Sequence, residues 1–268
     1  MKIVDCHVHV MHGEPDAREL LKQMDANGVY RSIVISDTER VSLQITREKL
    51  LRTKKLLDVD RERISGLAWV NPTIPGMIGL AEEAITDMGY VGLKIIPDHW
   101  FPYEKRLEPF WQKMNDLRAR ILFHTGILYG YDDGSRFCRP LYLEKLIHYP
   151  NIRFAMAHIS WPWCDECLAV MGRMRAATSV SGIQWQSYID TTPGVPRYMR
   201  KQALANAVEF CGEEHILFGT DSVIPGNLTH QADVIKRDLA IYDEIGLDEK
   251  QKERIFSGTA DELFPPRK

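Results

Sequence analysis

Two patterns of apolar and polar positions alternate along the chain. Short runs rich in β-branched and other apolar residues are separated by longer stretches in which apolar residues recur every three or four positions. The first pattern is typical of buried strands and the second of amphipathic helices. The strands that the pattern predicts are residues 3–10, 32–36, 64–70, 90–96, 121–124, 152–158, 186–189 and 216–219. For the seventh strand, residues 178–185 are an alternative to residues 186–189.

Helical patterns fill the intervals between these strands. The predicted helices include residues 17–27, 80–88 and 232–245, and each is followed directly by a glycine. Glycine at that place is a common helix stop, because it adopts the left-handed conformation that ends a helix. The sequence Asp248-Glu249-Lys250-Gln251 resembles a capping box, so we expect a last helix to begin there.

Polar side chains stand at or just past the ends of the predicted strands, at intervals of 28, 34, 23, 30, 34, 32 and 31 residues. These side chains are His9, Asp37, Asn71, Lys94, His124, His158, Asp190 and Asp221. A strand with its following helix takes about 30 residues, so eight such units nearly fill the chain. The spacing predicts an α/β protein with a single TIM-barrel domain over residues 1–268, a (β/α)₈ barrel; an open doubly wound sheet is the alternative.

Composition narrows the class of protein. The 268 residues are 44% hydrophobic and 26% charged, which is an ordinary globular balance. The net charge is −3 and the basic residues are scattered, so we expect no nucleic-acid partner. No apolar run reaches the roughly 18 residues that a membrane span needs. A strand begins almost at the first residue, so we expect no signal peptide and a cytoplasmic protein.

The five cysteines do not indicate a disulfide framework, because their number is odd and the chain is long. Cys164 and Cys167 form a Cys-x-x-Cys motif, but a structural zinc site needs a second pair of ligands. We expect ordinary thiols at the start of a helix there. Cys6 alternates with His7 along its strand, so we expect its side chain to face the helix layer.

Four side chains at strand ends can meet at the mouth of such a barrel. His7 and His9 are two residues apart on one strand, so they point the same way. Closure of the barrel brings the first and eighth strands together, which places Asp221 beside both histidines; His124 follows the fifth strand, across the mouth. Three nitrogens and one oxygen suit Zn²⁺, with Mn²⁺, Fe²⁺ or Co²⁺ also possible.

The same residues carry a resemblance to a known family. The chain resembles the amidohydrolase superfamily, and within it the amidohydrolase-related branch that includes aminocarboxymuconate-semialdehyde decarboxylase. The resemblance runs in order over nearly the whole chain and includes a closing segment at residues 255–264. The segments that carry it are Asp5-Cys6-His7-Val8-His9, Gly92-Leu93-Lys94, Phe123-His124-Thr125-Gly126, Ala157-His158 and Phe218-Gly219-Thr220-Asp221.

The resemblance implies a TIM barrel with one catalytic metal ion bound by His7, His9, His124 and Asp221. It implies that Asp221 also handles protons and that His158 is an acid or base that polarises or protonates the substrate. One departure concerns the residues after His158. The branch often has Gly-Gly there, whereas this chain has Ile159-Ser160, which affects the expected substrate contacts rather than the metal.

Several further residues are candidates for substrate binding. Lys94 can be carbamylated and bridge two metal ions, as in binuclear members of the superfamily, or can bind a substrate carboxylate; we favour a mononuclear site. Trp100, Tyr103, Trp161 and Trp163 follow the fourth and sixth strands and either wall a pocket or pack against the barrel. Arg136 can hold an anionic group or stay solvated. Asp190 can bind substrate or cap the next loop.

We expect a metal-dependent hydrolase that attacks an amide, ester or lactone of a small molecule through a metal-activated water. The alternative is a non-oxidative, metal-dependent decarboxylase of an aromatic or unsaturated acid. A metal-binding barrel without turnover is a third hypothesis. Barrels of this branch often pair, so a homo-oligomer is possible.

Overall fold

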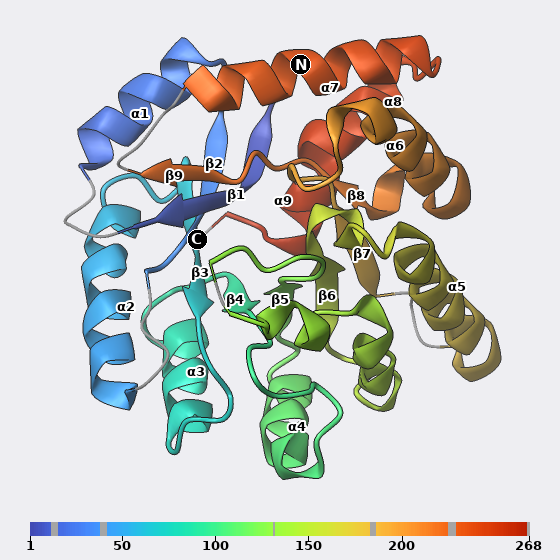
Figure 1. Cartoon of the computed structure of the whole chain (residues 1–268). Helices are drawn as coiled ribbons and strands as arrows, with labels where there is room; N and C mark the ends of the chain where they lie inside the picture. Colours follow the sequence, from blue (N-terminus) through green and yellow to red (C-terminus); the bar gives the residue numbers. More distant parts are fainter. Residues whose placement is uncertain (12–15, 38–41, 131, 183–185, 225–228, 267–268) are drawn as a thin grey trace.

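The described residues form a ring of parallel strands with helices around its outside (Figure 1). The computed structural model describes residues 1–11, 16–37, 42–130, 132–182, 186–224 and 229–266. The strands are β1 (Val4–Val10), β2 (Arg31–Ile35), β3 (Ile64–Trp69), β4 (Gly92–Ile95), β5 (Arg120–Phe123), β6 (Arg153–Met156), β7 (Ser187–Asp190), β8 (Ile216–Leu217) and β9 (Ser222–Ile224).

The sheet order β8-β7-β6-β5-β4-β3-β2-β1-β9 closes the ring, because β8 and β9 belong to one pass of the chain. β9 pairs in parallel with the end of β1, and the Cys6 N–H donates to the Phe218 carbonyl oxygen just below, at 3.1 Å. The predicted TIM barrel and its eight strand positions are therefore confirmed, with β9 as an additional short strand.

Most helices lie between successive strands and cover the outer face of the ring, whereas α7, α8 and α9 follow the last strand. Asp248 forms the predicted capping box with Gln251, and α5 begins at Cys164 as expected. Because α5 continues to Ser181, the alternative strand position is wrong for residues 178–181. The helices are α1 (Ala17–Ala26), α2 (Leu43–Leu57), α3 (Met77–Thr86), α4 (Glu108–Asp116), α5 (Cys164–Ser181), α6 (Arg197–Cys211), α7 (Thr229–Glu244), α8 (Glu249–Glu253) and α9 (Thr259–Leu263). After β5, the described segment contains 3-10 turns at Gly134–Phe137 and Pro140–His148 in place of an α-helix.

Among the described residues, two large buried clusters make up most of the core, and a third, small one contains Ile96, Leu128 and Cys138. The largest one joins the outward side chains of the strands to the helices. The second one fills the barrel interior and combines strand residues with residues of the closing helix α9, among them Ala260 and Leu263. Cys6 belongs to this inner cluster, so the prediction that it faces the helices is wrong. The register of β1 against β2 shifts between Asp5 and Val8, and this irregularity interrupts the strict alternation of side chains.

Among the described residues, no helix combines the length and the apolar character that a membrane crossing requires.

Two ion pairs connect α6 with α7, and they differ in exposure. The Arg200 guanidinium donates to Asp238 from Nε at 2.8 Å, and both side chains are fully buried. Arg200 also donates to the carbonyl oxygen of Thr191, directly after β7, at 2.5 Å. The pair Lys201–Glu244, at 2.9 Å, has both side chains more than half exposed. The buried pair therefore supports the end of β7 as well as the contact between the helices.

We predict that Asp238→Ala lowers the free energy of unfolding by about 3–5 kcal/mol, because it leaves the Arg200 charge buried without its partner. Glu244→Ala is the matched control between the same helices and should cost less than about 1 kcal/mol, because water screens that pair. Urea unfolding of both variants measures the two values. Equal losses would contradict this account of the α6–α7 contact.

Candidate metal centre

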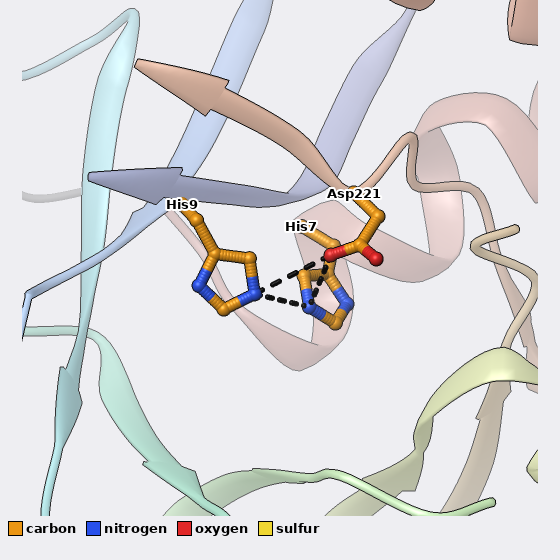
Figure 2. A group of neighbouring side chains, drawn as sticks. All are labelled: His7, His9 and Asp221. Atoms are coloured by element: carbon orange, nitrogen blue, oxygen red, sulfur yellow. Dashed lines mark hydrogen bonds and ion pairs between the residues drawn. The ribbon is translucent and has the colours of Figure 1, made fainter. Parts of the chain in front are cut away.

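Three donor atoms converge at the carboxyl end of β1 (Figure 2). His7 Nε2 lies 3.1 Å from His9 Nε2, and Asp221 Oδ1 lies 3.4 Å from the first nitrogen and 3.3 Å from the second. The two histidines come from β1, and Asp221 comes from the turn between β8 and β9. The predicted meeting of these three side chains across the closure of the barrel is present.

This triangle of atoms fits a divalent ion. A tetrahedral ion with bonds of about 2.0–2.1 Å holds its donor atoms about 3.3–3.4 Å apart. The three measured separations lie at or near that spacing. Two imidazole nitrogens and a carboxylate oxygen are also ligands that Zn²⁺ and neighbouring transition metals accept.

Asp5 holds the turn that carries Asp221. Its buried carboxylate accepts hydrogen bonds from the Thr220 N–H at 3.0 Å, the Thr220 hydroxyl at 2.5 Å and Gln231 Nε2 at 2.8 Å. Burial raises the pKa of Asp5 to about 6, although these hydrogen bonds oppose the rise. Asp221 itself has a φ of 57°, a left-handed conformation that is uncommon outside glycine and that neighbouring contacts must sustain. Sequence reasoning did not assign Asp5 a role, although an acid in the middle of a buried strand is a signal that a specific partner exists.

Asp190 orients His7. His7 Nδ1 lies 2.6 Å from Asp190 Oδ2, and both side chains are fully buried. The other carboxylate oxygen, Oδ1, accepts from the Thr192 N–H at 2.7 Å, so Asp190 does cap the loop after β7. Its contact with His7 was not foreseen from the sequence. Burial and the nearby Lys94 lower the pKa of His7 well below its usual range, so the ring is neutral and Nε2 carries a lone pair toward the other donors.

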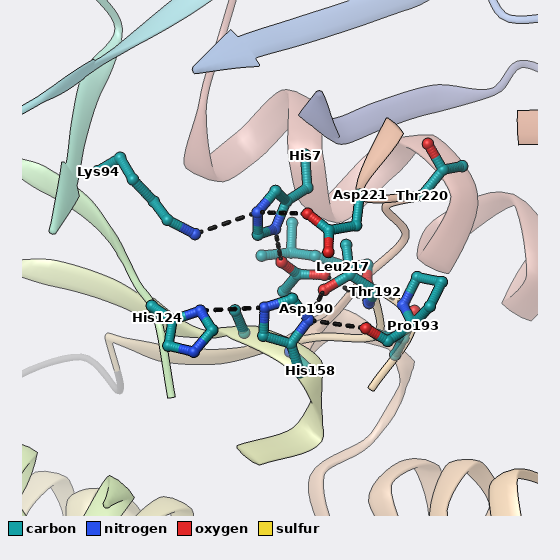
Figure 3. Close-up of polar contacts among 12 residues, drawn as sticks. His7, Lys94, His124, His158, Asp190, Thr192, Pro193, Leu217, Thr220 and Asp221 are labelled. Carbon is teal, nitrogen blue, oxygen red and sulfur yellow. Dashed lines mark hydrogen bonds and ion pairs between the residues drawn. The ribbon is translucent and has the colours of Figure 1, made fainter. Parts of the chain in front are cut away.

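His124 and His158 form a second pair of imidazoles next to His7 (Figure 3). His158 Nδ1 lies 2.9 Å from the Pro193 carbonyl oxygen, and His124 Nε2 lies 3.2 Å from the Ile127 carbonyl oxygen. A carbonyl oxygen only accepts, so these contacts favour the tautomers with the proton on His158 Nδ1 and on His124 Nε2; Thr192 Oγ1 also lies 2.9 Å from His158 Nδ1. In those tautomers His158 Nε2 and His124 Nδ1, which lie 3.2 Å apart, have no proton between them.

Two facing lone pairs favour a cation or a proton beside them. Burial lowers the pKa of both imidazoles, so a proton is held weakly there. This pair therefore offers nitrogen ligands or proton acceptors next to the group of His7, His9 and Asp221. His124 is outside that group in the described structure, and its role as fourth ligand stays a prediction.

The backbone after His158 adopts left-handed conformations. His158, Ile159 and Ser160 have φ values of 61°, 48° and 56°. Such values suit glycine, which explains physically why Gly-Gly is common here in the branch and why Ile159-Ser160 needs support. The Ser160 hydroxyl donates to Thr125 Oγ1 at 2.8 Å, and Gly194 gives the room that His158 needs, since a Cβ on Gly194 would lie 2.8 Å from the His158 Cβ.

Lys94 lies at the inner end of this site. Its Nζ is 3.1 Å from His7 Nε2, and its side chain is fully buried. Burial lowers the pKa of the Lys94 ammonium to about 8, while Asp221 and Asp190 oppose the shift. Lys94 is therefore mainly a cation at neutral pH, beside the proposed metal ligands.

The predicted substrate-binding aromatic residues have different environments. Trp100 is 2% exposed and belongs to the outer core, which agrees with the packing alternative. Tyr103 is 49% exposed and stacks on Phe101, with ring centroids 5.1 Å apart. Trp161 directly follows the left-handed turn at His158 and packs partly against the outer core.

The remaining two candidates lie in surface ion-pair networks. Arg136 stacks over Phe137 and lies 3.2 Å from Asp133, with both charged side chains 64% exposed. The ring of Trp163 lies under Arg139, 5.5 Å from its guanidinium carbon. A substrate role for these five residues stays a prediction. Trp69, which sequence reasoning missed, lies edge-on to His9 with ring centroids 6.2 Å apart and is a nearer aromatic wall.

Comparison with known proteins places the chain in a family. The family model described as amidohydrolase matches residues 4–265. The chain belongs to the amidohydrolase family. Hydrolases and decarboxylases both occur among the enzymes of this superfamily. No curated protein matches the chain significantly in sequence.

Solved structures of low sequence identity share the fold. The 5-carboxyvanillate decarboxylase of Novosphingobium aromaticivorans, complexed with manganese, is 13% identical over 98% of this chain and 96% of its own, with a TM-score of 0.72. The candidate 2-pyrone-4,6-dicarboxylic acid hydrolase of Pseudomonas putida is 14% identical over 98% and 97%, with a TM-score of 0.68. An amidohydrolase of Burkholderia multivorans with bound zinc is 15% identical over 99% and 100%, with a TM-score of 0.64. At these low sequence identities, the comparison shows that the three proteins share the barrel fold with this chain.

We predict that Gly219→Ala disturbs the metal centre. A Cβ there would lie 2.9 Å from the His7 Cβ and 2.7 Å from Thr192 Cγ2, so the segment between β8 and β9 must move away from His7 and Thr192. We expect a loss of about 1–3 kcal/mol in the free energy of unfolding from this overpacking, together with weaker zinc binding. Gly79→Ala in α3 is the control, because nothing lies within 4 Å of its Cβ. It should instead stabilise the protein by about 0.5–1 kcal/mol. Unchanged zinc affinity in Gly219→Ala would contradict this prediction.

Proposed function

We propose that this family member is a metal-dependent hydrolase of an amide, ester or lactone in a small molecule. The observation that carries the proposal is the Asp221 carboxylate, which stands 3.4 Å from His7 Nε2 and 3.3 Å from His9 Nε2. These three residues would hold one divalent ion, Zn²⁺ first and Mn²⁺, Fe²⁺ or Co²⁺ as alternatives, with His124 as the predicted fourth ligand. A bound ion supplies a Lewis acid and lowers the pKa of water toward neutrality.

The chain's own groups then handle protons and orient the substrate. Asp221 accepts a proton from the attacking water and delivers it to the leaving group. Beside a bound divalent ion the Asp221 carboxylate would be ionised, because the nearby positive charge favours its charged form. Neutral His158 can accept a proton at Nε2, because Nδ1 is committed to the Pro193 carbonyl oxygen.

Decarboxylation of an aromatic or unsaturated acid is the second candidate, and Lys94 is the observation that favours it. A buried ammonium 3.1 Å from His7 Nε2 can neutralise a substrate carboxylate at the same place. In that reaction the bond between the carboxylate carbon and the rest of the substrate breaks, CO₂ leaves, and the remaining carbon takes a proton that His158 or Asp221 has first taken up from solvent. Lys94 serves the hydrolase equally well by polarising a carbonyl oxygen, so we rank decarboxylation second.

We predict that the purified protein contains about one divalent ion per chain, a number set by one group of donors. His7→Ala and Asp221→Ala should each lose most of the ion, and with it the activity. His148→Ala is the control, since His148 is exposed on the 3-10 turn after β5. Elemental analysis with a zinc titration measures the content. A full complement of metal in His7→Ala would disprove the assigned ligands, whereas metal loss without loss of activity would reject a catalytic role for the ion.

We predict that the metal-loaded protein hydrolyses members of a panel of small lactones, esters and amides. The panel is run beside a set of aromatic and unsaturated acids whose CO₂ release is followed. The His7→Ala variant provides the background rate in both assays. Release of CO₂ alone would reject hydrolysis in favour of the second candidate, and no turnover by a loaded protein would favour the non-catalytic barrel.

A further inference from the structure

The last residue of β7 and the segment that follows it, residues 190–194, contact two of the site imidazoles (Figure 3). Asp190 Oδ2 accepts from His7 Nδ1 at 2.6 Å, and the Pro193 carbonyl oxygen lies 2.9 Å from His158 Nδ1. A bond from the Thr192 N–H to Asp190 Oδ1, at 2.7 Å, joins these two contacts within the segment. The imidazoles themselves come from β1 and from the turn after β6, which are far apart in the sequence.

We propose that Asp190 is a positioning residue that fixes His7 in the tautomer protonated at Nδ1, and so directs the His7 Nε2 lone pair at the metal. This inference rests on the metal site of the proposed function, but not on the reaction catalysed there. A carboxylate that accepts the distal N–H of a ligating histidine fixes the ring orientation and raises its basicity as a ligand.

The geometry leaves Asp190 no freedom to act otherwise. Asp190 and His7 are both fully buried, so no solvent water replaces either contact. Each carboxylate oxygen already accepts one N–H, from His7 on one side and from Thr192 on the other. The Asp190 carboxylate therefore offers one acceptor oxygen to each of the two donors, the N–H at His7 Nδ1 and the Thr192 backbone N–H.

An asparagine in place of Asp190 can satisfy only one of these two donors. If its oxygen accepts from the Thr192 N–H, its NH₂ group faces His7 Nδ1 and forces that nitrogen to be the acceptor. The His7 proton then moves to Nε2, where it blocks metal binding. If the amide is reversed, the NH₂ group opposes the Thr192 N–H and the loop that holds His158 shifts. Replacement of an orienting aspartate by asparagine is known to produce the wrong histidine tautomer in a catalytic triad.

The test measures the tautomer directly. Imidazole ¹⁵N spectra of the metal-free full chain, with His7 assigned by comparison with His7→Ala, should show the wild-type ring protonated at Nδ1. In Asp190→Asn we expect the proton on Nε2, and about 10–100-fold weaker binding of Zn²⁺ and of Mn²⁺ in competition with a chromophoric chelator. A His7 ring protonated at Nε2 in the wild type would overturn the proposal even if the variant failed to fold.

Asp37→Asn is the matched control. Asp37 is also a buried aspartate at a strand end, after β2, but it accepts from Lys49 Nζ at 2.9 Å. It should leave the His7 tautomer and the zinc affinity within about twofold of the wild type, an allowance that corresponds to about 0.4 kcal/mol. An equal loss of affinity in both variants, or no change in Asp190→Asn, would overturn the positioning role. A wild type that binds no metal but shows His7 protonated at Nδ1, with the shift in Asp190→Asn, would reject the proposed function and keep the role of Asp190.

Discussion

The closure of the barrel between β1 and the pass that contains β8 and β9 is the constraint on which the site depends. His7 and His9 belong to one side of this closure and Asp221 to the other, so no donor group exists unless the ring is closed. Asp5 holds the junction with hydrogen bonds to Thr220, the residue before Asp221. Burying a carboxylate without hydrogen-bond partners costs free energy of folding, so Asp5 needs these bonds. The same bonds fix the position of Asp221 relative to β1.

The second layer of the site consists of acceptors that decide which nitrogen of each imidazole is bare. Asp190 does this for His7, the Pro193 carbonyl oxygen for His158, and the Ile127 carbonyl oxygen for His124. All three rings are buried and have lowered pKa values. A ring N–H that lost its acceptor would therefore not readily form a hydrogen bond to solvent water instead. The support reaches outward, because buried Arg200 holds the Thr191 carbonyl oxygen next to Asp190 and is itself held by Asp238. The packing of α6 on α7 thus bears on the orientation of side chains inside the barrel mouth.

The sequence alone was sufficient to predict the barrel and the group of His7, His9 and Asp221. Both predictions need only the strand periodicity and the interval of about 30 residues, which can be recognised without knowing any contact. It was insufficient where a single residue breaks a period. The register shift in β1 turns Cys6 inward together with His7, and alternation alone predicted the opposite. Asp190 was visible as an acid at a strand end, but its partner lies 183 positions away, and only the closed ring shows it. Trp100 and Trp69 show the same limit of sequence analysis. Trp100 lies in a loop but belongs to the core, whereas Trp69 lies at the end of a strand, next to His9.

Hydrolysis and decarboxylation require nearly the same groups, and the position of Lys94 explains why the barrel alone does not separate them. Lys94 is the last but one residue of β4 and faces His7 from inside the ring, so a substrate oxygen that reached it would lie between its ammonium and the proposed metal. If that oxygen belongs to a carbonyl, the carbon is exposed to attack by water near Asp221. If it belongs to a carboxylate, the scissile bond points away from Lys94 toward whatever lines the mouth. The choice between the two reactions therefore depends on the side chains around the rest of the substrate, and the candidates are Trp69 at the end of β3, Tyr103 after β4 and Trp161 after β6.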